Sequence, residues 1–156
     1  MFYAIIKVNI SFKIKIMKKC KITGPGLLAG LVMLVVGMVV GQLLNFLMPG
    51  LVDEYSNTAL FRAWEDPIMS FYFVYFFALG LGLAWIWDKV KDKVKGKKPC
   101  KRAFRLTWKY WLAVLLPGML ITYSSFPISF AMLFAWSLGS FIQIWFGFTV
   151  LAKVKK

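Results

Sequence analysis

The sequence contains no histidine, two cysteines and only six acidic residues among 156. The lack of histidine excludes a His-ligated haem or zinc site, and it removes the side chain that most often exchanges protons near neutral pH. Cys20 and Cys100 lie too far apart in the chain to form a CxxC metal-binding motif. No secretory signal with a small-residue cleavage site is visible. The sequence therefore predicts no metal centre and no bound cofactor.

Apolar residues, in contrast, make up 60% of the chain and aromatic residues 18%, with a mean hydropathy of +0.70. Soluble domains are roughly 45–50% apolar. A helix that crosses a bilayer uses about 20 apolar residues, and four such stretches lie at about 27–47, 68–87, 108–124 and 128–152. Four spans and their connections take up nearly the whole chain, which predicts an all-α fold, a polytopic membrane bundle of four transmembrane helices arranged as two antiparallel hairpins.

The positions of the basic residues predict how this bundle is oriented. Six lysines precede the first span, ten lysines and arginines lie from Asp88 to Lys109, and three lysines end the chain, which leaves only Arg62 for the opposite side. Four of the six acids fall on the side of Arg62. Because positively charged loops stay in the cytoplasm, we expect both termini and the central segment to be cytoplasmic (N-in/C-in), in the cell membrane.

The same patterns divide the chain into three parts. Residues 1–22 form a basic cytoplasmic arm, 23–152 a single four-helix transmembrane domain, and 153–156 a basic cytoplasmic tail. The arm has two interpretations, because MKKCKITGPG from Met17 is itself a normal lead-in to a first span. Either the arm lies on anionic lipid, or it lies upstream of a true translation start at Met17.

Small residues recur along the first and fourth spans at spacings of about four. Such small-xxx-small patterns let the backbone of another helix approach closely. They predict helix packing, either within the bundle or between copies of the chain. The residues are Gly26, Gly30, Gly37, Gly41, Ala135, Gly139 and Gly147.

Pro117 and Gln143 are unusual residues for the interior of a span. Pro117 predicts a kink in the third span, either a functional hinge or a proline that the helix simply tolerates. Gln143 is the most deeply placed amide, and it favours a hydrogen bond between helices over a role in transport. A small oligomeric permease or channel would use these two residues and Gln42 to line a path.

The loop between the first two spans holds the acidic residues that could do chemistry. Paired carboxylates can bind a hard cation or share acid–base work, but adjacent acids equally suit a solvated loop. Asp66 precedes a proline, so it is also expected to cap the second span. The candidate outer-face site consists of Arg62, Trp64, Glu65 and Asp66, together with Gln143.

The central basic segment is expected to face anionic lipid head groups on the cytoplasmic side, in addition to fixing the topology. Nucleic acid is not expected as a partner, because no aromatic platform or nucleic-acid-binding motif accompanies the charges. The lipid-facing residues are Lys89, Lys91, Lys93, Lys95, Lys97, Lys98, Lys101, Arg102 and Arg105.

With FRAWEDPIMSFYF at 61–73 and LPGMLITYSSFP at 116–127, the chain resembles small four-span membrane proteins of prokaryotes that carry no assigned activity. The resemblance covers most of residues 23–152 and implies architecture only. The leading functional hypothesis is a non-enzymatic membrane protein that acts through helix–helix association, as a homo-oligomer or as a subunit with a membrane-protein partner. The alternatives are the permease or channel and, least favoured, an enzyme that acts on lipid at the outer face.

Overall fold

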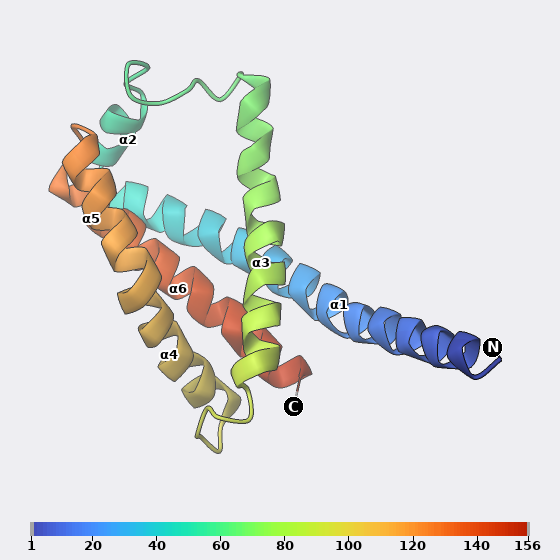
Figure 1. Ribbon diagram of the computed structural model, residues 1–156. Helices are drawn as coiled ribbons and strands as arrows, with labels where there is room; N and C mark the ends of the chain where they lie inside the picture. Colours follow the sequence, from blue (N-terminus) through green and yellow to red (C-terminus); the bar gives the residue numbers. More distant parts are fainter. Residues whose placement is uncertain (1, 156) are drawn as a thin grey trace.

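The computed structural model describes the backbone of residues 2–155 and the side chains of residues 22–155. All regular structure between residues 2 and 155 is helical, as the sequence predicts, and no strand occurs there. In chain order the elements are α1 (Phe2–Leu47), α2 (Gly50–Tyr55), the 3-10 helix η1 (Pro67–Ser70), α3 (Phe71–Val90), α4 (Pro99–Tyr110), the π-helical turn η2 (Trp111–Leu115), α5 (Leu116–Ser125) and α6 (Phe130–Val154) (Figure 1).

Three helical stretches are long and apolar enough to cross a membrane, namely Ile22–Leu47, Pro67–Val90 and Phe130–Val154. They match the first, second and fourth predicted spans to within a few residues. The third predicted span, 108–124, falls on α4, η2 and α5, which follow one another without a break. It is not among the three, since the lysine and aromatic residues at its start and the hydroxyl residues at its end lower its hydropathy.

The basic N-terminal arm is continuous with the first span in the structure. Helix α1 runs through the predicted boundary at residue 22, and Pro25 lies inside it. The side chains of residues 1–21 lie outside the described part of the chain, and so does the whole of residue 156. The predictions that rest on the lysines of the arm therefore stay predictions.

Helix α6 occupies the centre of the bundle. Helices α1, α3, α4 and α5 all contact it, while α1 also packs along α3 (Figure 1). The main core joins α1, α3 and α6 through large buried side chains that include Met33, Phe76, Trp87 and Phe148. In a membrane such packing stabilises the bundle through close van der Waals contact, because lipid tails are as apolar as the core itself.

Helices α1 and α3 meet at glycines, where their backbones touch. A Cβ atom added to Gly80 would lie 2.6 Å from the backbone nitrogen of Gly30, and one added to Gly26 would lie 3.0 Å from Cα of Leu81. No side chain larger than hydrogen fits between backbones at these distances. The glycines therefore fix where the two helices cross.

A π-helical turn precedes Pro117, the position at which the sequence predicts a kink. Proline cannot donate a backbone hydrogen bond and clashes with the preceding turn. Immediately before it, the helix widens over Trp111–Leu115, and the backbone N–H of Leu116 bonds to the carbonyl of Trp111, five residues back. The helical path continues into α5, which starts at Leu116 and ends at Ser125.

Candidate functional site

Asp66 holds the start of the second span, as its position before Pro67 predicts. Its Oδ1 accepts a hydrogen bond of 2.9 Å from the backbone N–H of Ile68, and its Oδ2 accepts one of 2.8 Å from Nη1 of Arg62. The N–H of Ile68, followed by Arg62, lowers the pKa of Asp66 below its ordinary value. The carboxylate is thus committed to a cap and an ion pair.

Glu54 plays a structural part that the sequence did not reveal. Its two carboxylate oxygens accept hydrogen bonds of 2.6 Å from the backbone N–H and from Oγ of Ser129. The same Ser129 hydroxyl oxygen accepts a 3.0 Å bond from the N–H of Met132, so it is the N-cap of α6. A negative charge beside a helix N-terminus is favourable, and this contact ties α2 to α6.

The predicted outer-face residues do not converge on one point. Arg62 and Asp66 pair with each other, while Trp64 is two-thirds exposed and turns its ring edge toward Tyr72. Glu65 is exposed on the loop. Gln143 lies on a different element, α6. Within residues 22–155, no group of three or more His, Cys, Asp or Glu side chains is placed to hold a metal ion.

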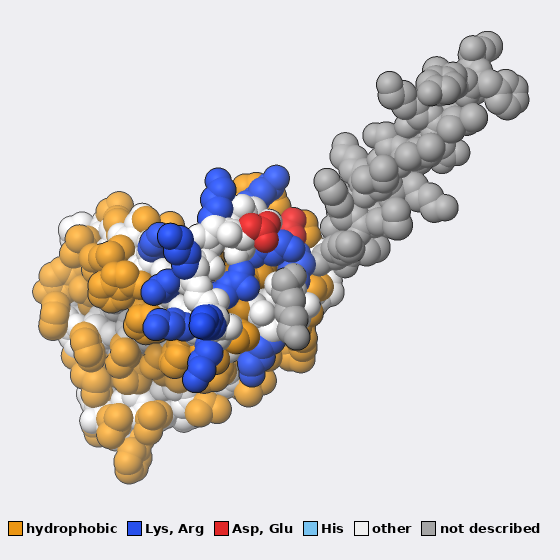
Figure 2. All heavy atoms as spheres, turned by 90° about the horizontal axis from the view of Figure 1, so that it is seen from below, with side chains coloured by type: hydrophobic (Ala, Val, Ile, Leu, Met, Phe, Trp, Pro, Cys, Tyr) orange, Lys and Arg blue, Asp and Glu red, His pale blue; other side chains and the backbone are white. Residues whose placement is uncertain are grey.

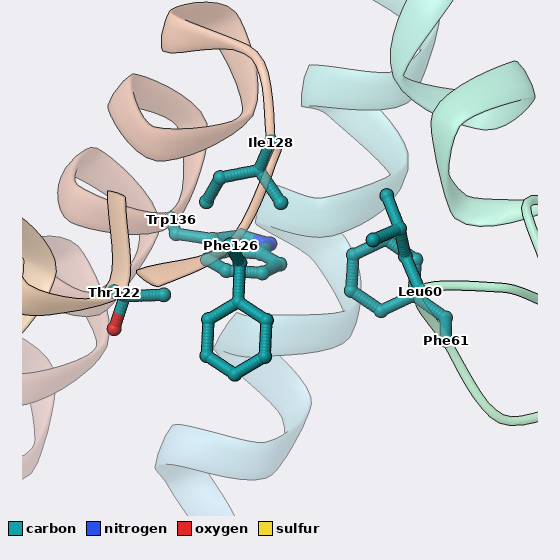
Figure 3. Close-up of a pocket in the computed structure, with 6 residues that line it drawn as sticks. All are labelled: Leu60, Phe61, Thr122, Phe126, Ile128 and Trp136. Carbon is teal, nitrogen blue, oxygen red and sulfur yellow. The ribbon is translucent and has the colours of Figure 1, made fainter. Parts of the chain in front are cut away.

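A cavity of about 210 Å³ lies beside this loop, between it, the end of α5 and the start of α6 (Figure 3). Its polar side chains are turned to other partners. The hydroxyl of Thr122 donates to the carbonyl of Gly118, and the indole N–H of Trp136 donates to the hydroxyl of Tyr55. The cavity thus offers apolar contact without groups to orient a polar substrate. Its lining residues are Leu60, Phe61, Thr122, Phe126, Ile128 and Trp136.

Most of the predicted helix-packing residues pack within the chain. Gly26 and Gly30 lie at the crossing with α3, and Gly147 faces the thioether of Met33. Gly139 is in ordinary contact with α1, and Ala135 is buried in a second core cluster at the outer end. Gly41 differs from all of these, because no atom of another described helix lies within 4 Å of its Cβ position.

Gln143 lies against Gly37, one helical turn before the open Gly41. The amide nitrogen of Gln143 is 2.8 Å from the Cβ position of Gly37, so the glycine makes room for the amide. Gln143 is half-buried, and its amide has no hydrogen-bond partner among the residues whose side chains are described. An unpaired amide in an apolar medium costs free energy. The amide of Gln143 is not among the buried side-chain polar atoms that lack a partner in the described part of the chain, so it is accessible from outside the bundle.

The first five residues of α3 (Phe71–Tyr75) are its least buried part. Their side chains are between 42% and 69% exposed, and Tyr72 and Tyr75 also contact the ring of Phe76. Phe76, the next residue, is buried and reaches the Cβ position of Gly37. Toward its N-terminal end α3 diverges from α1 and α6 (Figure 1). This exposed, mostly aromatic surface is thus followed along α3 by Phe76, which meets Gly37 together with Gln143.

The basic segment gathers at the other end of the molecule (Figure 2). Most of its lysines are exposed, but Arg102 turns inward: its Nε donates to the carbonyl of Val94 at 3.2 Å, and its Nη2 donates to that of Lys91. Arg105 makes one such bond, 2.8 Å to the carbonyl of Lys95. Arg102 therefore holds the connection between α3 and α4.

Comparisons of the chain with protein-family models, with curated proteins and with solved structures found no match.

Proposed function

We propose that the chain is a non-enzymatic membrane subunit that acts by helix–helix association. Three neighbouring features carry this proposal. The amide of Gln143 has no hydrogen-bond partner in the described chain, the Cβ position of Gly41 is open, and the first five residues of α3 (Phe71–Tyr75) are exposed. A partner helix seated there would cover Phe71–Tyr75 and give the amide a hydrogen-bond partner. A second copy of the chain or another membrane protein would supply that helix.

The energetics favour a helix as the occupant of this surface. Lipid tails can cover aromatic side chains, but they cannot form a hydrogen bond with an amide. A bond between helices in a membrane is worth about 1 kcal/mol. Gly41 adds room for a backbone to approach closely, which is the usual feature of helix contacts in membranes.

The alternatives have less support in the geometry. Glu54 and Asp66 are engaged in capping helices, so neither is placed as a free acid or base for an enzyme. Gln42 and Pro117 are both exposed, on α1 and α5, whereas Gln143 packs on Gly37. These three residues do not share one path of the kind that a permease or channel needs.

We further propose that α4, η2 and α5 make a fourth crossing and that both chain ends are cytoplasmic. The basic connection between α3 and α4 lies at one end of the molecule. The ammonium of Lys155 pairs with Asp88 at 3.2 Å and brings the C-terminal segment to that end. Glu54 and Ser129 meet at the opposite end. The separation of bases from acids supports the positive-inside orientation.

Cys100 provides a test of this orientation. It is exposed at the start of α4. In a Cys20→Ser background, we expect a membrane-impermeant maleimide to label Cys100 only after the cells are permeabilised. Labelling in intact cells would overturn the proposed orientation.

Substitutions at Gly41 and Gln143 test the association proposal. We expect the chain, extracted from native membranes in a mild detergent, to run as a complex whose mass by light scattering exceeds that of one chain. Gly41→Leu and Gln143→Leu should each shift it to the single chain. Gly82→Leu is the matched control, because Gly82 is also open but lies on the inner half of α3.

Two results would reject association through this surface. One is a wild-type chain that is extracted alone, and the other is a Gly41→Leu chain that keeps its complex. Gly37→Leu is unsuitable for the test, since its side chain would collide with Gln143 and disturb the bundle itself.

A further inference from the structure

An aromatic ledge lies along the contact between α4 and α6. Trp108 and Trp111 stack with ring centroids 5.4 Å apart, and Phe104 meets Trp145 edge-on at 5.9 Å. Hydrogen bonds fix the indoles: Trp111 donates to Ser137 Oγ at 3.2 Å, and Trp145 donates to a backbone carbonyl of α4 at 3.5 Å. The ledge consists of Phe104, Trp108, Trp111, Phe141 and Trp145.

A basic stripe runs directly beside this ledge. Lys101, Arg105 and Lys109 recur every four residues on α4, so they share one face of the helix, and all three are exposed. Trp108 and Phe104 lie on the adjoining face and are 48% and 46% exposed, so rings and charges are accessible side by side. Arg105 uses one of its five N–H groups on a loop carbonyl, which leaves the rest for a ligand.

We propose that the stripe and the ledge together bind an anionic phospholipid of the cytoplasmic leaflet. The phosphate would contact the ammonium and guanidinium groups, and the glycerol and upper acyl region would lie on the exposed rings. Charge complementarity selects an anionic ligand, and aromatic rings are typical of the depth at which head groups meet hydrocarbon. The proposal uses the cytoplasmic placement of α4 but does not depend on a partner helix at Gln143.

Two observations separate this site from a general attraction of the whole basic segment. Arg102, between Lys101 and the rest of α4, is withdrawn by its bonds to loop carbonyls. Lys93 and Lys97 lie in the connection 91–98, which contains no aromatic residue, whereas Lys101 and Lys109 share α4 with the exposed rings of Phe104 and Trp108. Binding of a lipid at this site should therefore depend on Lys101 and Lys109 of α4 and much less on the loop lysines Lys93 and Lys97.

The test uses the full chain in phosphatidylcholine vesicles that contain increasing fractions of brominated phosphatidylglycerol, which quenches nearby tryptophans. We expect Lys101→Gln/Lys109→Gln to raise the lipid fraction needed for half-maximal quenching by about fivefold or more. This pair leaves the bond from Arg105 to its loop carbonyl in place. The matched control, Lys93→Gln/Lys97→Gln, removes the same charge and should leave the value close to wild type.

Trp108→Phe tests whether Trp108 is the tryptophan that the brominated lipid quenches. This change should remove a large part of the quenching, while the circular dichroism spectrum stays unchanged. An equal effect of the two lysine pairs would show diffuse attraction and overturn the site. Quenching that is the same with brominated phosphatidylcholine would overturn the preference for an anionic lipid. Neither result would bear on the mass of the detergent-extracted complex, so the two proposals fail separately.

Discussion

Arg102 lies over the indole ring of Trp87, with its guanidinium carbon 5.1 Å from the ring centroid. Trp87 is fully buried near the end of α3, and its N–H donates to the carbonyl of Lys155 at 3.3 Å. One indole therefore joins α3, α4 and the C-terminal segment. The two carbonyl bonds of the same arginine add the α3–α4 connection to this junction.

Replacing Arg102 by lysine should destabilise this junction. An ammonium group cannot reproduce the planar fork that stacks on a ring while it donates to two carbonyls. We expect Arg102→Lys to lower the free energy of unfolding by about 2 kcal/mol, measured by denaturant titration in detergent. Arg105→Lys, which alters one exposed bond, is the control and should have a small effect. Equal losses from the two changes would contradict the assignment.

The glycine crossing predicts a contrast between two positions on α3. Gly80→Ala should cost about 2 kcal/mol or more, because its methyl group would overlap the backbone of α1. Gly82→Ala meets no atom within 4 Å and should be neutral or slightly stabilising, since alanine is the better helix former. Thermal unfolding followed by circular dichroism separates them. A Gly80→Ala chain as stable as wild type would mean that α1 and α3 do not touch there.

The contact between Glu54 and Ser129 predicts an energetic coupling between α2 and α6. Ser129→Ala removes the N-cap and should cost about 1 kcal/mol. Glu54→Gln should cost less alone, and the double variant should lose less than the sum of the two. Asp53→Asn serves as the control, since that exposed side chain makes no hydrogen bond in the described structure. Strict additivity in the cycle would show that the two residues act independently.

Asp66 predicts a pH dependence of known sign. Its pKa is lowered in the folded chain, so its contribution to stability is complete above the ordinary aspartate value and is lost as the pH falls through the lowered one. Because the N–H of Ile68 is the larger cause, Arg62→Gln should raise the pKa only part of the way back. A carbon NMR titration of the Asp66 carboxyl measures both values. A full return to the ordinary pKa in Arg62→Gln would assign the effect to the ion pair instead.

Hydropathy and charge predicted much of the architecture because they report on the solvent of each segment. The all-helical fold and the three apolar spans followed from these patterns, and the cap by Asp66 followed from its place before Pro67. The sequence also predicts a span at 108–124, but Lys109 and several polar residues make this stretch only weakly apolar, and it is not among the three helices long and apolar enough to cross a membrane. The structure shows that it belongs to the continuous helical path of α4, η2 and α5.

Contacts between residues far apart in the chain could not be predicted from the sequence. The pairs Gly26–Gly30 and Gly37–Gly41 have the same spacing of four, yet Gly26, Gly30 and Gly37 are in contact within the chain and Gly41 is open. Which face of a helix meets a neighbour depends on the crossing geometry, which no local pattern encodes. The pairing of Glu54 with Ser129 joins residues 75 positions apart and left no sign in either segment.

The central place of α6 has a consequence for how the protein is made. It follows α1, α3, α4 and α5 in the chain, yet all four pack on it. During synthesis α1 and α3 can meet at their glycines, but α4 and α5 are made before the surface that they pack on exists. A nascent chain halted before Phe130 therefore has no partner for the faces of α4 and α5 that α6 later covers.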